Sequence, residues 1–232
     1  MKRFWTAAQA VADGPCWAIL LDGRAVRTPG RASLTVPGEA LARAIVAEWD
    51  AQGETIDPRT MPMTGFANAT IDRVLPAIGD FRGQVAAYAE SDLLCYRADG
   101  PEALIAAQAA AWGPLLDWAG RRHAIAFNVT TGILPVDQPA LTLEALRGAV
   151  EALDPWVLAG VATLTQISGS LVSALALIEG AAELEGLWAA VTVDERWQAE
   201  QWGADEAATA QLEAHRADFA HAAHYCALVK AG

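Results

Sequence analysis

Residues 155–178 read PWVLAGVATLTQISGSLVSALALI, a stretch without a charged side chain. It is long enough to span a bilayer. However, it contains Ser, Thr and Gln side chains, and its flanking residues Asp154 and Glu179 are acidic, whereas membrane spans are usually anchored by Lys or Arg. We therefore expect no membrane insertion and predict a buried central helix that is broken near Ser168-Gly169. Asp154-Pro155 predicts its start, with a capping acceptor followed by proline at the first helical position.

Helical periodicity extends on both sides of this stretch. Ala and Leu recur at helical spacing from Pro101 onward. Thr64–Leu75 and Ile78–Ala89 predict two earlier helices, separated by Pro76. Ala124–Val129 is the exception, because it reads as a loop or a short edge strand. Most of the chain is therefore expected to be helical.

The first 37 residues instead predict strands and turns. Cys16–Leu21 is a short apolar run, and Asp22-Gly23 is a hairpin signal that leads into Arg24–Thr28. Ser33–Val36 is a further candidate strand, and an amphipathic helix follows from Glu39 to Ala51. These patterns predict an α+β fold, with a small N-terminal α/β domain of antiparallel strands (residues 1–85) and a larger all-α helical bundle (residues 86–232).

Composition excludes several classes of function. The formal net charge is −12, and an acidic chain without a basic stripe would repel nucleic acid. Cys16, Cys95 and Cys226 are odd in number and widely spaced, which suits a reducing compartment. We expect them to be small buried hydrophobic residues.

Motifs for catalysis or cofactor binding are weak. The chain has no GxxxxGK[ST] loop and no GxGxxG after a strand, so we expect no nucleotide, no other cofactor and no small-molecule substrate. His215, His221 and His224 could serve an enzyme or a zinc site, which is the alternative hypothesis. His221 and His224 share a helical face, but His215 points elsewhere, and zinc needs three or four converging ligands. We therefore expect no metal.

Acidic residues are concentrated near the C-terminus. Between Glu179 and Asp218 there are ten acidic residues and two arginines, interleaved with Trp188, Trp197 and Trp202. Acidic helices with interleaved indole rings suit a protein partner, although a solvated face with buried Trp residues is the simpler interpretation. Leu184, Leu187, Trp188 and Val191 recur at helical spacing, which predicts a core-facing stripe.

The acidic residues also have local explanations. Thr192 to Glu195 has the spacing of a capping box, in which the threonine hydroxyl accepts from the backbone N–H of Glu195. Asp205 and Glu206 follow Gly203 and are expected at a helix N-terminus, where negative charge is favourable. Capping and partner binding therefore remain open as alternatives for these side chains.

Several strings resemble, in this order and over nearly the whole chain, the ATP synthase assembly-factor family that chaperones the alpha subunit of the catalytic head. They are Lys2-Arg-Phe-Trp5, Leu21-Asp-Gly-Arg24, Val26-Arg-Thr-Pro29, Ala47-Glu-Trp-Asp-Ala-Gln52, Ile56-Asp-Pro58, Met61-Pro-Met-Thr64, Ile71-Asp-Arg-Val74, Asp92-Leu-Leu-Cys-Tyr-Arg97 and Gln201-Trp-Gly203.

The resemblance implies a two-part α+β chaperone without catalytic activity. It would bind the free alpha subunit, mask surface that would otherwise aggregate, and give way when the beta subunit arrives. Relatives in the mitochondrial matrix carry presequences, whereas this chain starts directly at the domain, so a bacterial cytoplasmic protein is expected.

The resemblance also points to residues. Glu195, in the Asp194-Glu195 string, resembles a family position tied to function, and Trp49 resembles a structurally critical one. The segment around Asp205 is less acidic than the family's usual pattern, with alanine at 204 and 207. We expect partner binding by the acidic, Trp-containing helices, through Glu195, Asp194, Trp197, Trp202, Asp205 and Glu206, and structural roles for Trp49, Asp72 and Arg73.

Overall fold

The computed structural model describes residues 2–232, and their contacts divide the chain into two compact units. The N-terminal unit extends to Ile78 and includes residues 154–160 and 224–232; the helical unit comprises residues 79–153 and 161–223. The predicted boundary at residue 85 falls inside α3 (Ile78–Ala87). Sequence patterns could not show that two late segments return to the N-terminal unit, because this depends on contacts such as the stacking of Tyr225 on Phe66.

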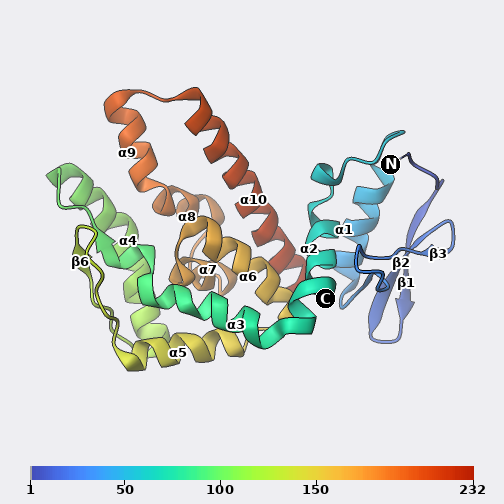
Figure 1. Ribbon diagram of the computed structural model, residues 1–232, viewed down its shortest axis with the longest axis horizontal. Coiled ribbons are helices and arrows are strands. Elements are labelled where there is room, and N and C mark those ends of the chain that lie inside the picture. Colours follow the sequence, from blue (N-terminus) through green and yellow to red (C-terminus); the bar gives the residue numbers. More distant parts are fainter. Residues whose placement is uncertain (1) are drawn as a thin grey trace. The chain divides into compact units, whose positions relative to one another are not determined.

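The N-terminal unit contains a small antiparallel sheet (Figure 1). Its central strand pairs with each of the other three; the strands are β1 (Ala8–Asp13), β2 (Cys16–Leu21), β3 (Arg24–Ala25) and β4 (Thr35–Val36). Asp22 and Gly23 both have positive φ angles, 47° and 78°, as a two-residue hairpin turn between twisted strands requires. The predicted hairpin is therefore confirmed. The sequence did not single out β1, whose alternation is weak.

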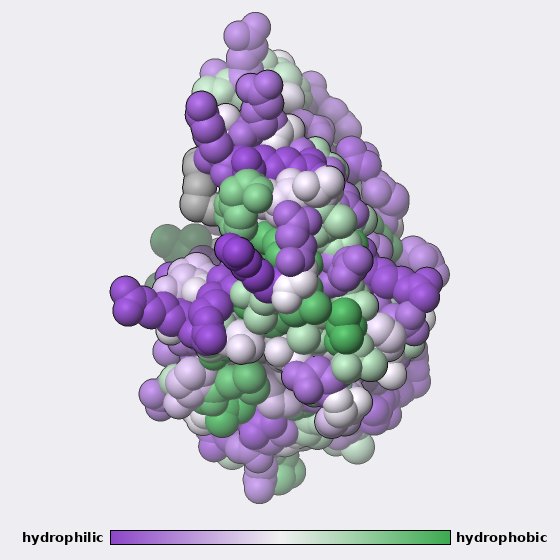
Figure 2. Space-filling view, turned by 90° about the vertical axis from the view of Figure 1, so that its right-hand side faces the viewer, coloured by the Kyte–Doolittle hydropathy of each residue, from purple (hydrophilic) through white to green (hydrophobic). Residues whose placement is uncertain are grey.

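One face of this sheet packs on α1 (Glu39–Asp50). Ile19 and Leu21 of β2 are buried, as are Leu41 and Ile45 of the helix. The predicted amphipathic helix is confirmed. The opposite face carries Val11 and Leu20, which are at least partly exposed, and Figure 2 shows apolar residues among polar ones on the side that carries the sheet.

The chain then follows an almost unbroken helical path. A 3₁₀ turn at Pro58–Thr60 precedes α2 (Pro62–Ala69), a π-helical turn at Thr70–Val74, a 3₁₀ turn at Leu75–Ala77 and α3. The carboxylate of Glu48 accepts from the backbone N–H groups of Met63 and Thr64, at 2.6 and 2.8 Å, and so satisfies the free donors at the start of α2. The predicted separation of two helices at Pro76 is wrong. The chain stays helical through Pro76, because a π-helical turn and a 3₁₀ turn accommodate the missing N–H.

The helical unit carries most of the remaining chain. Two 3₁₀ turns, Tyr88–Ser91 and Leu93–Cys95, lead to a parallel pair of short strands, β5 (Tyr96–Arg97) and β6 (Thr130–Thr131). Residues 124–129 precede β6 without regular structure, in line with the predicted loop. The helices are α4 (Glu102–His123), α5 (Ala140–Glu151), α6 (Pro155–Ser168), α7 (Leu171–Ile178), α8 (Leu184–Val191), α9 (Val193–Trp202) and α10 (Glu206–Lys230).

The charge-free stretch forms α6 and α7, with the break at the predicted place. Gly169 has a φ of 66°, and the Ser170 side chain accepts from the backbone N–H of Ser173 at 3.0 Å, which caps α7. Asp154 accepts from the N–H of Trp156 at 2.8 Å, so the predicted start is also confirmed. Within residues 2–232, no helix is long and apolar enough to cross a membrane.

The α+β class is confirmed, with strands near the N-terminus and helices after them. In the helical unit, α4 contacts α7, α8 and α9. The Trp112 indole of α4 is buried and donates to the carbonyl of Ala190 in α8 at 2.7 Å. This packing supports the base of α9, where the candidate site begins.

Candidate functional site

The predicted partner-binding residues lie on a hairpin made by α9 and the first turns of α10. Figure 1 shows the two helices joined at the hairpin turn, which comprises Gly203, Ala204 and Asp205. Every residue from Gln198 to Gln211 is exposed, and α9 has no buried residue. The second half of α9, the turn and the first turns of α10 are therefore all accessible to a partner.

The start of α10 is capped as the sequence predicts. The Asp205 carboxylate accepts from the backbone N–H of Ala208 at 2.8 Å, and Glu206 lies in the first turn. Both negative charges are favourable there, since the free N–H groups make this end of the helix partly positive. Asp205 thus has a demonstrable capping role.

The predicted capping box at Thr192 is wrong. The Thr192 hydroxyl donates to the carbonyl of Trp188 at 2.7 Å, one turn back in α8, and makes no capping bond to α9. Its φ and ψ of −112° and 23° differ from the extended backbone of a typical N-cap, because α8 runs into α9 with one residue between them. Glu195 consequently makes no capping hydrogen bond.

The adjacent acids Asp194 and Glu195 have different environments. Asp194 is half-buried and accepts from the Gln108 side-chain amide at 2.8 Å. Gln108 is 2% exposed, and its carbonyl oxygen accepts from the backbone N–H of Ala98 at 2.8 Å. This chain of hydrogen bonds attaches the first turn of α9 to α4. Glu195 is exposed and makes no hydrogen bond or ion pair within residues 2–232.

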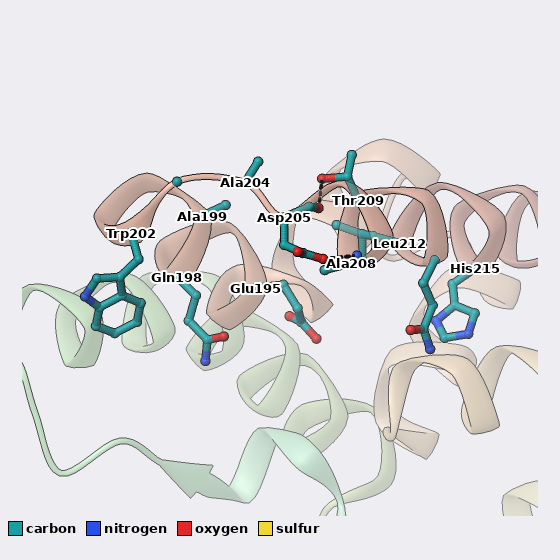
Figure 3. Close-up of a pocket in the computed structure, with 12 residues that line it drawn as sticks. Glu195, Gln198, Ala199, Trp202, Ala204, Asp205, Ala208, Thr209, Leu212 and His215 are labelled. Carbon is teal, nitrogen blue, oxygen red and sulfur yellow. Dashed lines mark hydrogen bonds between the residues drawn. The ribbon is translucent and has the colours of Figure 1, made fainter.

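A groove lies between α9 and α10, with a volume of about 480 Å³. Figure 3 shows Glu195, Gln198 and Trp202 projecting to the same side of α9, as their spacing of three and four residues requires. Trp202 is 78% exposed. Small side chains, Ala199, Ala204 and Ala208, line the groove together with Leu212 and His215.

The groove brings together only part of the predicted set. Glu195, Trp202 and Asp205 line it, whereas Asp194, Trp197 and Glu206 do not. The sequence patterns did not indicate Gln198, Ala199, Ala208 and Leu212, and they indicated His215 only as a metal or catalytic candidate. Only their spacing could have indicated them, since they share helix faces with Glu195 or Asp205. Alanine, leucine and glutamine side chains form no motif that is typical of a binding site.

Two other acids of this region are already paired. Arg216 binds Glu185 at 2.7 Å, and Arg122 binds Glu179 at 2.6 Å. Of the two arginines between Glu179 and Asp218, Arg216 is thus engaged away from the groove, and Arg196 does not line it. The negative charge at the groove is therefore not balanced by a lining Lys or Arg.

The three histidines of the alternative hypothesis differ in their surroundings. His215 lines the groove, His221 is half-buried and His224 is exposed. Across residues 2–232, no three His, Cys, Asp or Glu side chains are grouped as metal ligands. Burial raises the pKa of the Cys226 thiol to about 12. Cys95 and Cys226 are buried as predicted, while Cys16 is only partly so.

The predicted structural residues lie in the N-terminal unit. Trp49 is half-buried and packs edge-to-face on Trp5, with ring centroids 5.0 Å apart. Asp72 accepts from the Thr28 hydroxyl and from the backbone N–H of Gly30, both at 2.7 Å. Arg73 is exposed and has no hydrogen bond or ion pair within residues 2–232.

The loop before α5 exposes large apolar side chains. Ile133 is 95% exposed and Leu134 is 75% exposed. Hydrogen bonds between Asn128 and Gln138, at 2.8 and 3.0 Å, fix the base of this loop. A partner that covered the loop would remove the apolar surface of these two adjacent side chains from water.

Comparison with known proteins gives consistent matches. Residues 2–120 match the family described as ATP12 chaperone protein. Atp12 from Paracoccus denitrificans is 41% identical, with a TM-score of 0.95, and the match covers 98% of each chain. A mutant form of the same bacterium's Atp12p is 40% identical, also with a TM-score of 0.95, over 98% of this chain and 97% of that one.

A third similar structure is the Atu1473 protein of Agrobacterium tumefaciens, described as a candidate chaperone. It is 38% identical, with a TM-score of 0.92, and the match covers 97% of this chain and 85% of that one. The family match and the similar structures are all described as chaperones or as Atp12.

Proposed function

The chain belongs to the ATP12 chaperone protein family and is an ATP synthase assembly chaperone, and from this premise we propose that it holds the unassembled alpha subunit of the catalytic head. It would prevent aggregation of that subunit until the beta subunit joins. The observation that carries the proposal is the likeness to Paracoccus Atp12 over 98% of the chain.

The α9–α10 hairpin is the surface best suited to contact this client. It combines an exposed Trp202, a free Glu195 carboxylate and a groove lined by small residues. Aromatic side chains with adjacent charge are common in binding surfaces, because the ring supplies buried area and the charge supplies orientation. The exposed Ile133 and Leu134 supply a further apolar contact in the same unit.

We propose that the chain acts by binding alone. The alternative of an enzyme or zinc protein on the histidine helix lacks converging ligands within residues 2–232. Elemental analysis of the purified protein tests it, because stoichiometric zinc would favour the alternative. The cytoplasmic location expected from the sequence stays a prediction.

Co-expression with an isolated alpha subunit tests the proposed function. The chain should increase the fraction of alpha subunit in the soluble lysate, because it covers surface that otherwise aggregates. The control is the same expression without the chain. An equal soluble fraction in both cultures would overturn the proposal.

A second measurement separates a chaperone from a permanent subunit. Assembled ATP synthase is purified from cells that express the tagged chain. A chaperone is released before assembly is complete and should be absent from the purified complex. Stoichiometric retention would indicate a structural subunit instead.

A further inference from the structure

The groove between α9 and α10 is a helix-lined surface that nothing in residues 2–232 covers. A helix in a globular protein usually buries one face. Here α9 buries no residue, and the lining residues are all exposed except Leu212, which is half-buried. The hairpin is held at its base by the hydrogen bond between Gln108 and Asp194. The faces of α9 and α10 that line the groove are therefore available to a partner.

Charge restricts what can occupy this groove. Glu195, Asp205 and His215 are the ionisable side chains that line it, and no Lys or Arg is among them. Asp205 already accepts from Ala208, whereas Glu195 has no partner within residues 2–232. An acidic occupant would be repelled, while a cationic side chain would find a free carboxylate and, one turn beyond Gln198, the exposed Trp202 ring.

Shape favours a helix over an extended strand. The lining is made of helix side chains, and the small residues Ala199, Ala204 and Ala208 let another backbone come close. A strand placed here would have no strand edge to pair with, and its backbone N–H and C=O groups would be left without partners. A helix satisfies these groups internally.

We propose that the groove seats an amphipathic, basic helix of the client. Its apolar side packs on Ala199, Ala208 and Leu212, and its Lys or Arg side chains face Glu195 and Trp202. Because α9 has ten residues, the seated segment has about the same number, or about 15 Å of helix. The identity of the client rests on the proposed function; the groove and the chemistry of its occupant rest on the geometry.

Photo-crosslinking tests the identity of the occupant. Benzoylphenylalanine is placed at Gln198, inside the groove, and the full chain is mixed with purified alpha subunit and irradiated. The matched control places the same group at Glu200, which is exposed and lies about 140° around the helix from Glu195. We expect crosslinks from position 198 to one alpha-subunit segment with Lys or Arg at helical spacing, and few from position 200.

Charge reversal tests the electrostatic part. Glu195→Lys should weaken alpha-subunit binding about tenfold or more, because it replaces an attraction at the groove with a repulsion. Glu200→Lys changes the net charge equally but lies outside the groove, so it should change the affinity by about twofold or less. Circular dichroism of both variants checks that the helices are retained.

The outcomes distinguish the two proposals. If the wild-type chain keeps the alpha subunit soluble but crosslinks reach acidic or extended segments, or arise equally from positions 198 and 200, the helix-in-groove proposal is wrong and the chaperone function stands. Equal loss of affinity in the two charge reversals would also overturn it. If the wild-type chain does not hold the alpha subunit, the proposed function is wrong and the groove proposal falls with it.

Discussion

Asp92 is a completely buried carboxylate that joins two distant parts of the helical unit. It accepts from the backbone N–H of Leu94 at 3.1 Å and from that of Val172, in the first turn of α7, at 3.0 Å. Burial raises its pKa to about 6, although hydrogen bonds from Val172, Ser170, Leu94 and Leu171 act in the opposite direction. A single side chain thus connects the turn before β5 to a buried helix.

The raised pKa predicts a pH dependence of stability. The ordinary pKa is 3.8, so between about pH 4 and pH 6 the folded protein retains a proton that the unfolded chain releases. The contribution of Asp92 to the free energy of unfolding should therefore decrease as pH rises through this window, by about 3 kcal/mol in total.

Asp92→Asn removes this titration and tests it by urea unfolding at pH 4 and pH 7. The variant should be less stable than wild type, by about 1–3 kcal/mol at pH 4, because the amide cannot accept at both oxygen positions. By pH 7 the deficit should disappear or change sign, because wild type alone has lost about 3 kcal/mol through the titration of Asp92. Asp99→Asn, at an exposed site, is the control. A deficit that does not change with pH would contradict the prediction.

Asp72 and Arg73 are neighbours with different surroundings. Asp72→Ala should lower the free energy of unfolding by about 1–3 kcal/mol, because it leaves Thr28 and the Gly30 N–H without their acceptor. Arg73→Ala should change it by about 0.5 kcal/mol or less, since the side chain is exposed. Thermal unfolding of the two variants compares them, and equal losses would assign Arg73 a role that its surroundings do not explain.

At the scale of elements, the break between α6 and α7 depends on Gly169. Its φ of 66° lies in the left-handed region, which costs other residues about 1–2 kcal/mol. Gly169→Ala should therefore destabilise the protein by about that amount. Gly186→Ala, within α8 and with open space for the added methyl group, should stabilise it by about 0.5–1 kcal/mol. Denaturant unfolding of both variants would reveal opposite signs, and the same sign would contradict the prediction.

A hydrogen bond from the Gln108 side chain to Asp194 attaches α9 to α4. Gln108→Met keeps the volume of the side chain but removes the hydrogen bonds to Asp194 and Ala98. We expect faster amide exchange in residues 193–202, because the first turn of α9 loses its connection to α4. Gln198→Met, in the exposed groove, is the control. Unchanged exchange in α9 would show that other contacts hold the hairpin.

At the scale of the whole molecule, the net charge of −12 should affect the rate at which the chain associates with its client. If the occupant of the groove is basic, the long-range field should speed its encounter with the chain. Raising NaCl from 0.05 to 0.5 M should slow association about tenfold or more, because screening shortens the range of the field. Stopped-flow mixing with the alpha subunit measures this, and a rate independent of salt would contradict it.

Local patterns in the sequence were sufficient for much of the fold. The hairpin at Asp22-Gly23, the helix at Glu39–Asp50 and the break at Gly169 depend on backbone preferences and on hydrophobic spacing within a few residues. The strings that carried the family resemblance are also partly local, and Glu48 and Asp72 within them hold turns and helix ends together.

Only the tertiary structure decided the rest, because it depends on residues far apart in the chain. It attached Asp194 to Gln108 and left Glu195 free. It also returned Tyr225 to the N-terminal unit. The bond from Thr192 to Trp188 that replaces the expected capping box is local, and it forms because only one residue separates α8 from α9. The charge-free stretch could be identified as a buried broken helix from its composition alone, whereas the groove could not, since its shape depends on how the turn at residues 203–205 places α9 and α10.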